Sequence, residues 1–170
     1  MDTSLDKINR VSWQEFIRLL GGIFEHSPWV AELAYVQRPF ESTEQLHLVM
    51  VNAVHQASDE RRRELLCSHP ELAGKEAESG ELTADSKREQ AGAGLNQCSG
   101  EELIRIKSFN QAYMEKFGFP FIIAVTGLDK FQIMAAMDKR LNNTAADEFT
   151  TAIGEVEKIA RIRLDALIDG

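Results

Sequence analysis

The sequence predicts an all-α protein, a single-domain bundle of about eight or nine helices with an irregular apolar segment near residues 117–127. Serines three residues before Glu or Gln recur as helix starts, and apolar residues follow them at helical spacing. No stretch alternates at period two for long enough to form a sheet. The chain has 170 residues, 44% of them hydrophobic, and shows no repeat and no linker, so we assign residues 1–170 to one domain.

Four helices are expected before residue 70. Capping-box spacing begins the first and third, and a Ser-Pro pair supplies an N-cap and a first-turn proline for the second. The serines at these starts are Ser12, Ser27 and Ser42. The expected helices run from about 13 to 24, from 28 to before Pro39, from 42 through Val54, and from 59 to 67.

The second half of the chain begins with an expected long loop, residues 70–85, which contains two glycines, many charges and few large apolar side chains. Ser86 with Glu89 then has the spacing of a capping box that starts a short helix ending near Gly92. Further helices are expected from Ser99, at about 129–141 and at about 145–168.

The sequence FGFPFIIAVTG, residues 117–127, departs from the helical pattern. Gly118, Pro120 and Gly127 interrupt it, so Phe121 to Val125 should be extended or irregular. Buried N–H groups in such a segment must find acceptors. A ligand with oxygen acceptors would serve, and so would neighbouring side chains or water.

The last expected helix carries an arginine on its apolar stripe, which comprises Phe149, Ile153, Val156, Ala160, Arg163 and Leu167. A buried arginine needs an anionic partner, either a carboxylate of the protein or an anionic substrate. Snorkelling at the edge of the stripe is the alternative. Arg161, four residues after Glu157, is typical of a solvated surface pair.

His69 lies directly before Pro70 in the sequence SHPELAGKE, where the proline disfavours helical backbone for the histidine. A stiff, extended position suits a catalytic group, and it suits an ordinary helix stop equally. Ser86 and Glu89 likewise fit either a helix cap or a polar site.

Composition excludes several classes of partner. The formal net charge of −8 and the lack of a basic cluster argue against nucleic acid and anionic membranes. No apolar run approaches the ~20 residues of a transmembrane helix, and no secretory signal is visible. Cys67 and Cys98 fit reduced thiols in a cytoplasmic protein. The four histidines lack metal-ligand spacing, so no metal site is expected.

Seven segments in this order resemble one family over almost the whole chain. They are FEHSPW (24–29), RPF (38–40), SHPELAGK (68–75), LTADSKREQAGAGL (82–95), FNQAYMEKFGFPFIIAVTG (109–127), RLNN (140–143) and KIARIRL (158–164). The resemblance is to the 2-oxo-4-hydroxy-4-carboxy-5-ureidoimidazoline (OHCU) decarboxylases of urate breakdown. It implies a homodimeric, cofactor-independent carbon–carbon lyase that converts OHCU to (S)-allantoin and carbon dioxide.

The resemblance also assigns roles to residues of this chain. His69 matches the family's catalytic histidine, and Pro70 lies beside it at the ligand. Ser86, Glu89 and Gln90 match a polar substrate clamp, with Glu89 also expected to move protons. The backbone of Phe121, Ile122, Ile123, Ala124 and Val125 is expected to meet the substrate. Arg163 matches the anion-binding arginine, and Arg161 is the fallback.

Two other functions remain open on the sequence. A non-catalytic helical domain could bind a ureide through the same pocket, although it would not need both His69 and Glu89. A hydrolase acting on 5-hydroxyisourate is weaker, because no group other than His69 could obviously activate water.

Overall fold

The structure is a computed structural model that describes residues 3–168. Within this range the chain forms ten α-helices and one 3₁₀ helix and has no β-strand, apart from an isolated bridge between Thr3 and Ile168. The predicted all-α class is confirmed. The same residues contain no helix long and apolar enough to cross a membrane.

The helices in chain order are α1 (Leu5–Arg10), α2 (Trp13–Leu20), α3 (Trp29–Tyr35), α4 (Thr43–Gln56), α5 (Asp59–Cys67), α6 (Lys75–Ser79), α7 (Ala84–Gly92), the 3₁₀ helix η1 (Leu95–Gln97), α8 (Gly100–Phe117), α9 (Lys130–Arg140) and α10 (Ala145–Leu167). Contacts along the chain divide it into two compact units. The first comprises residues 1–68 and 156–170, and the second comprises residues 69–155.

In the first unit, α3 packs against α2 and α4. Phe16 of α2 lies at its centre, fully buried, with its ring 5.3 Å from the Tyr35 ring in an edge-on arrangement. The C-terminal part of α10 adds buried Val156, Leu164 and other apolar side chains to this unit.

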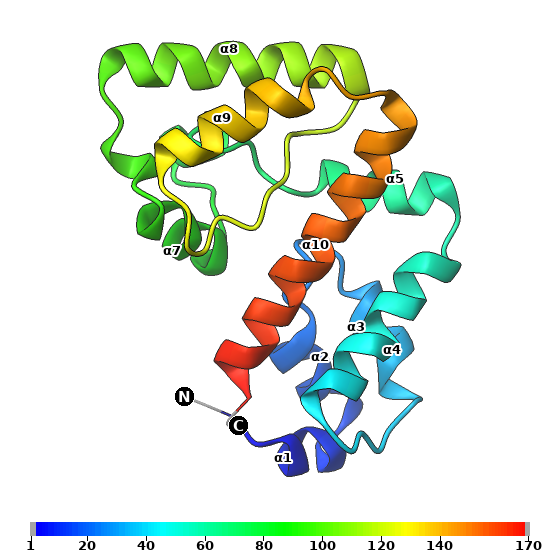
Figure 1. Cartoon of the computed structure of the whole chain (residues 1–170). Helices are drawn as coiled ribbons and strands as arrows, with labels where there is room; N and C mark the ends of the chain where they lie inside the picture. Colours follow the sequence, from blue (N-terminus) through cyan, green and yellow to red (C-terminus); the bar gives the residue numbers. More distant parts are fainter. Residues whose placement is uncertain (1–2, 169–170) are drawn as a thin grey trace. The chain divides into compact units, whose positions relative to one another are not determined.

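In the second unit, Figure 1 shows α8 and α9 side by side, with the chain between them running below both helices. Tyr113 of α8 is the centre of an aromatic cluster, and its ring lies 5.4 Å from that of Phe121. The other rings of the cluster are Phe117, Phe119 and Phe149. Residues 118–129 between α8 and α9 form no helix, as the glycines and proline predicted.

Local capping signals located several helices correctly. Ser12, Ser42 and Ser99 are the N-caps of α2, α4 and α8, as their spacing predicted, and Ser99 completes a capping box with Glu102. Asp129 and Gln132 form another complete box at the start of α9, which was not predicted. Each box satisfies backbone N–H groups that the first helical turn leaves without partners. The helix predicted over 59–67 is α5.

Other local predictions were wrong. Helix α1 was not predicted, α6 interrupts the expected 70–85 loop, and α2 ends at Leu20 and not near 24. The Ser27 hydroxyl does not cap α3, because it donates to the Glu25 carbonyl at 2.9 Å. A short polar side chain near a helix start can bond locally in more than one way, and sequence spacing does not choose between them.

Candidate active site

The segment that carries His69 opens the second unit and turns sharply at Leu72 and Ala73. Ala73 has φ +49°, a left-handed conformation that costs a non-glycine residue ~1–2 kcal/mol. Its N–H donates to Gln90 Oε1 at 2.9 Å, and Asn110 Nδ2 donates to the Leu72 carbonyl at 3.0 Å. Two buried amide side chains therefore hold the turn that follows His69.

Helix α7 presents the other predicted polar residues. Thr83 is its N-cap and accepts the Ser86 N–H at 3.2 Å, so the prediction that Ser86 begins the helix was wrong. Positions 86, 89 and 90 fall within about 100° of arc on the helix. Ser86 and Gln90 are buried and Glu89 is half-buried. The capping explanation for Ser86 and Glu89 is thereby removed.

Gln90 links these two elements, because it lies on α7 and accepts from the His69 segment. An amide that accepts through its oxygen has its NH₂ group left to donate. Gln90 can therefore offer donors to an oxygen of a ligand while it holds Ala73.

The irregular segment 121–125 is largely buried, with Phe121, Ile122 and Val125 each less than a tenth exposed. Side chains satisfy part of its backbone: Arg140 Nη1 donates to the Ile122 carbonyl at 2.7 Å, and the Ala124 N–H donates to Glu155 Oε1 at 3.4 Å. The N–H groups of Ile122, Ile123 and Val125 donate to no other residue between 3 and 168. Side chains between residues 3 and 168 therefore form hydrogen bonds with only some of the backbone N–H and C=O groups of segment 121–125.

Arg140 belongs to a buried network that the sequence analysis did not predict. Its Nε and Nη2 lie 3.0 and 2.9 Å from Glu148 Oε2, and Glu148 also accepts from Tyr113 Oη at 2.5 Å and Asn143 Nδ2 at 2.8 Å. Tyr113 and the RLNN motif at 140–143 both lie in segments that carry the family resemblance, which gave neither of them a role.

The network keeps Glu148 ionised although the residue is inaccessible to solvent. Burial opposes the charge, but the hydrogen bonds from Arg140, Tyr113 and Asn143 outweigh it and hold the pKa of the carboxyl below its ordinary value. Burial, together with the bond to Glu148, raises the pKa of the Tyr113 hydroxyl. The ion pair and the neutral phenol are therefore the stable forms near neutral pH.

Arg163 belongs to the first unit, whereas the other predicted site residues belong to the second. It is 5% exposed, so it does not snorkel. Its Nη2 lies 2.7 Å from Glu25 Oε2, and its Nη1 donates to the Gly22 carbonyl at 3.2 Å. A carboxylate of the protein is therefore one anionic partner of this arginine.

Arg161 has the surface position that its sequence context predicted, but its neighbours differ. It pairs with Asp165 at 2.9 Å and Glu44 at 3.3 Å, and not with Glu157. Glu157 instead contacts His55 through its carboxylate and His47 through its backbone carbonyl. Two carboxylates at the surface already neutralise Arg161.

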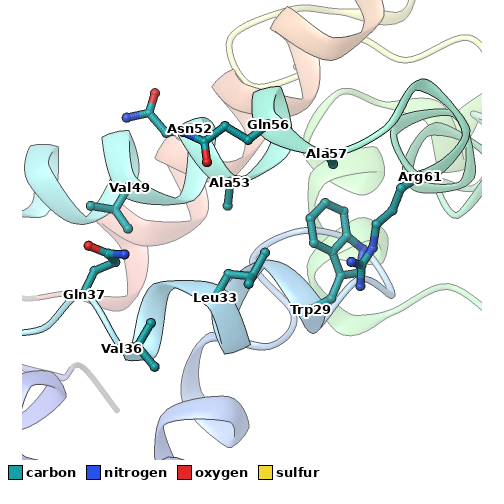
Figure 2. A pocket seen from close by; sticks show the side chains of 10 residues that line it. All are labelled: Trp29, Leu33, Val36, Gln37, Val49, Asn52, Ala53, Gln56, Ala57 and Arg61. Atoms are coloured by element: carbon teal, nitrogen blue, oxygen red, sulfur yellow. The ribbon is translucent and has the colours of Figure 1, made fainter.

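Two cavities lie outside the predicted site. One of about 470 Å³ lies between α3 and α4, where the guanidinium of Arg61 stacks 4.1 Å from the Trp29 ring (Figure 2). The other, about 360 Å³, adjoins α8 and the Glu71–Lys75 stretch. None of the predicted site residues lines either cavity. No group of three or more His, Cys, Asp or Glu side chains within residues 3–168 could hold a metal ion.

Comparison with known proteins identifies the family. The model of the OHCU decarboxylase family matches residues 9–165, which span both units. The chain belongs to this family. The match includes every predicted site residue, from His69 to Arg163, and so confirms the resemblance seen in the sequence.

Individual members of the family support this assignment. The chain is 40% identical to a 2-oxo-4-hydroxy-4-carboxy-5-ureidoimidazoline decarboxylase of Haloferax volcanii, over 96% of this chain and 95% of that protein. It is 41% identical to a uric acid degradation bifunctional protein of a Bacillus species, over 96% of this chain and 32% of that protein. The crystal structure of an (S)-allantoin synthase matches with a TM-score of 0.79 and 32% identity, over 98% of this chain and 55% of that one.

Proposed function

We propose that this protein decarboxylates OHCU to (S)-allantoin and carbon dioxide in urate catabolism. The observation that carries the proposal is the match of the decarboxylase family over residues 9–165, which contains the whole predicted site. The Haloferax volcanii relative bears the name of this activity and is matched over nearly its full length. The geometry around Gln90 and segment 121–125, rich in polar groups among buried side chains, suits a small polar substrate.

The reaction breaks the bond between a ring carbon and its carboxylate and leaves an electron pair on the ring. The substrate's own C=N group, conjugated with the ureido group, can accept that pair, so we propose that no cofactor takes part. A proton then adds to the ring, and the face that receives it sets the handedness of allantoin. The protein has to hold, polarise and protonate the substrate.

We assign these tasks to the predicted residues. His69 and Glu89 move protons, with Pro70 beside the ligand and Ser86 within the polar clamp. Gln90 and the backbone of Phe121–Val125 bind the ureido and ring amides. Arg163 orients the substrate anion through its planar fork of donors. The role of Gln90 and segment 121–125 in binding the ureido and ring amides has structural support. The Gln90 NH₂ group and several N–H groups of the segment are donors that the hydrogen bonds among residues 3–168 do not use.

Three further properties belong to the proposal. We propose that both units act as one decarboxylase domain, which the family match across them supports. We propose a homodimer, on the family resemblance, and a cytoplasmic location, which Cys67 and Cys98 support because neither forms a disulfide within residues 3–168.

The test is stereochemical. Fresh OHCU is generated from urate, and optical rotation is followed with and without the purified protein. Spontaneous decay gives racemic allantoin, so the protein should accelerate carbon dioxide release and yield the (S) enantiomer. A ureide-binding protein without activity would leave the product racemic, and that result would refute the decarboxylase assignment.

A further inference from the structure

We propose that Arg140 is a positioning residue for the reaction, because it fixes the direction in which the backbone of segment 121–125 presents its donors to the substrate. The inference rests on the proposed function. Arg140 is not itself expected to touch the substrate.

The contacts of Arg140 with the segment involve two successive residues. Its Nη1 donates to the Ile122 carbonyl at 2.7 Å, and its guanidinium carbon lies 4.3 Å from the centre of the Phe121 ring. A hydrogen bond to one peptide and stacking on the preceding side chain together restrict both the position and the rotation of the chain.

The direction of the Ile123 N–H follows from the first of these contacts. In a trans peptide the carbonyl and the N–H point in opposite directions, and the peptide between Ile122 and Ile123 is trans. With the Ile122 carbonyl turned toward Arg140, the Ile123 N–H points away from it. That N–H is among the donors that bond to no other residue between 3 and 168.

Glu148 keeps the guanidinium in place. It binds Nε and Nη2 of Arg140 side by side, and its remaining acceptor positions accept hydrogen bonds from Tyr113 and Asn143. A carboxylate with four donors around it has little freedom to rotate, so the fork of Arg140 is fixed as well. Positions 140 and 148 lie on α9 and α10, whose packing therefore determines the geometry of segment 121–125.

Arginine is required for this arrangement because one side chain must serve two acceptors in different directions. Nε and Nη2 face Glu148, while Nη1 faces Ile122. A lysine could neutralise Glu148, but its compact ammonium cannot reproduce the planar fork that also holds the carbonyl.

The first experiment compares Arg140→Lys with Tyr113→Phe. Both changes disturb the hydrogen bonds of Glu148, but only the first removes the guanidinium from Ile122. Melting temperature, kcat, KM and the enantiomeric excess of allantoin are measured, the last at enzyme concentrations high enough that spontaneous decay is negligible. We expect Arg140→Lys to lower kcat/KM by about 10–100-fold and to reduce the (S) excess. Tyr113→Phe should melt earlier but keep both kinetic constants and the (S) excess, because Arg140 keeps its own bonds to Glu148 and to the Ile122 carbonyl.

A second variant covers the case in which Arg140→Lys does not fold. The double change Arg140→Met with Glu148→Met removes both buried charges together, which leaves no unpaired ion in the core. It should fold and show the same loss of kcat/KM and of (S) excess.

The outcomes separate the two proposals. A folded Arg140→Lys or double-Met protein with wild-type kcat/KM and full (S) excess would overturn the positioning role while the decarboxylase assignment stands. Equal kinetic losses in Tyr113→Phe would also overturn it, since general loosening of the unit would then explain the effect. A wild-type chain that produces only racemic allantoin would refute the decarboxylase assignment itself.

Discussion

At the scale of single residues, Gln90 connects structure with the proposed chemistry. Its side-chain oxygen accepts the N–H of the strained Ala73, so the turn after His69 depends on a residue of the predicted substrate clamp. Substrate contacts made by Gln90 and the placement of His69 are then coupled through one side chain. Variants of Gln90 would therefore mix the two effects.

We predict that His69→Asn removes most of the activity and leaves the fold intact. His69 follows the end of α5 and lies outside the apolar faces of the helices, while a general acid or base typically contributes ~10²–10⁴-fold. Stereospecific turnover measures the loss of activity, and the circular dichroism melting curve shows whether the fold is intact. Near wild-type production of (S)-allantoin by the purified variant would show that the histidine is an ordinary helix stop.

For Arg163 we predict a severe effect of Arg163→Lys, about tenfold or more in kcat/KM, although the charge is kept. Lysine can pair with Glu25, but it cannot reproduce the fork that also binds the Gly22 carbonyl and that we propose orients the substrate anion. The matched control is Arg161→Lys, which should be nearly silent because Arg161 is a surface residue paired with Asp165 and Glu44. If Arg161→Lys were the damaging change, the anion site would belong to Arg161.

At the scale of elements, the residue that caps helix α7 differs from the residue of α7 that is proposed to act on the substrate. Thr83 caps the helix, and Glu89, six residues later, does not lie at the position from which a capping box closes. Sequence spacing alone favoured Ser86 as the cap, with Glu89 as its partner. The structure gives the cap to Thr83, whereas the proposed chemistry belongs to Glu89, so the two can be tested apart.

We predict opposite results for Thr83→Ala and Glu89→Gln. The first removes the cap and should lower the free energy of unfolding by ~0.5–2 kcal/mol while activity is kept. The second keeps shape and stability but removes a charge and a proton acceptor, and should reduce turnover by ~10²-fold or more. Chemical denaturation measures the free energy of unfolding, and the optical-rotation assay measures turnover to (S)-allantoin. An active, normally stable Glu89→Gln protein would deprive His69 of its proposed partner.

At the scale of the whole molecule, the first unit is assembled from both ends of the chain, whereas the second is continuous. Residues 156–168, which comprise the C-terminal part of α10 and Ile168, contribute buried side chains to the first unit. They also contribute Arg163, the partner of Glu25. This unit therefore cannot be completed until residues 156–168 are in place.

We predict that truncation after Glu155 unfolds the first unit. Val156, Leu164 and Ile168 are each at least nine-tenths buried, and the loss of three such side chains costs ~5–9 kcal/mol, close to the ~5–15 kcal/mol of a typical domain. The buried Glu25 would also lose its counter-ion. Hydrogen exchange should show amides of α2–α4 losing protection. Retained protection there would mean that α10 is dispensable for the unit.

The sequence by itself determined the all-α class, the starts of α2, α4 and α8, the irregular segment after α8 and the family. These features depend on residues close together in the chain: a cap and its third helical residue, a glycine or proline that breaks a helix, or a motif read in order. Each such signal is short, and the family signal is a series of short motifs in order, so none of them requires knowledge of packing.

Only the tertiary structure decided which partner each buried polar group has. Arg163 pairs with Glu25, 138 positions away, and Arg140 on α9 binds the Ile122 carbonyl, 18 positions away. Packing also gave the cap of α7 to Thr83 and buried Ser86, although both residue types can cap a helix. Periodicity shows that a polar side chain faces the core, but the identity of its partner depends on which distant backbone or side-chain group the packed helices bring against it.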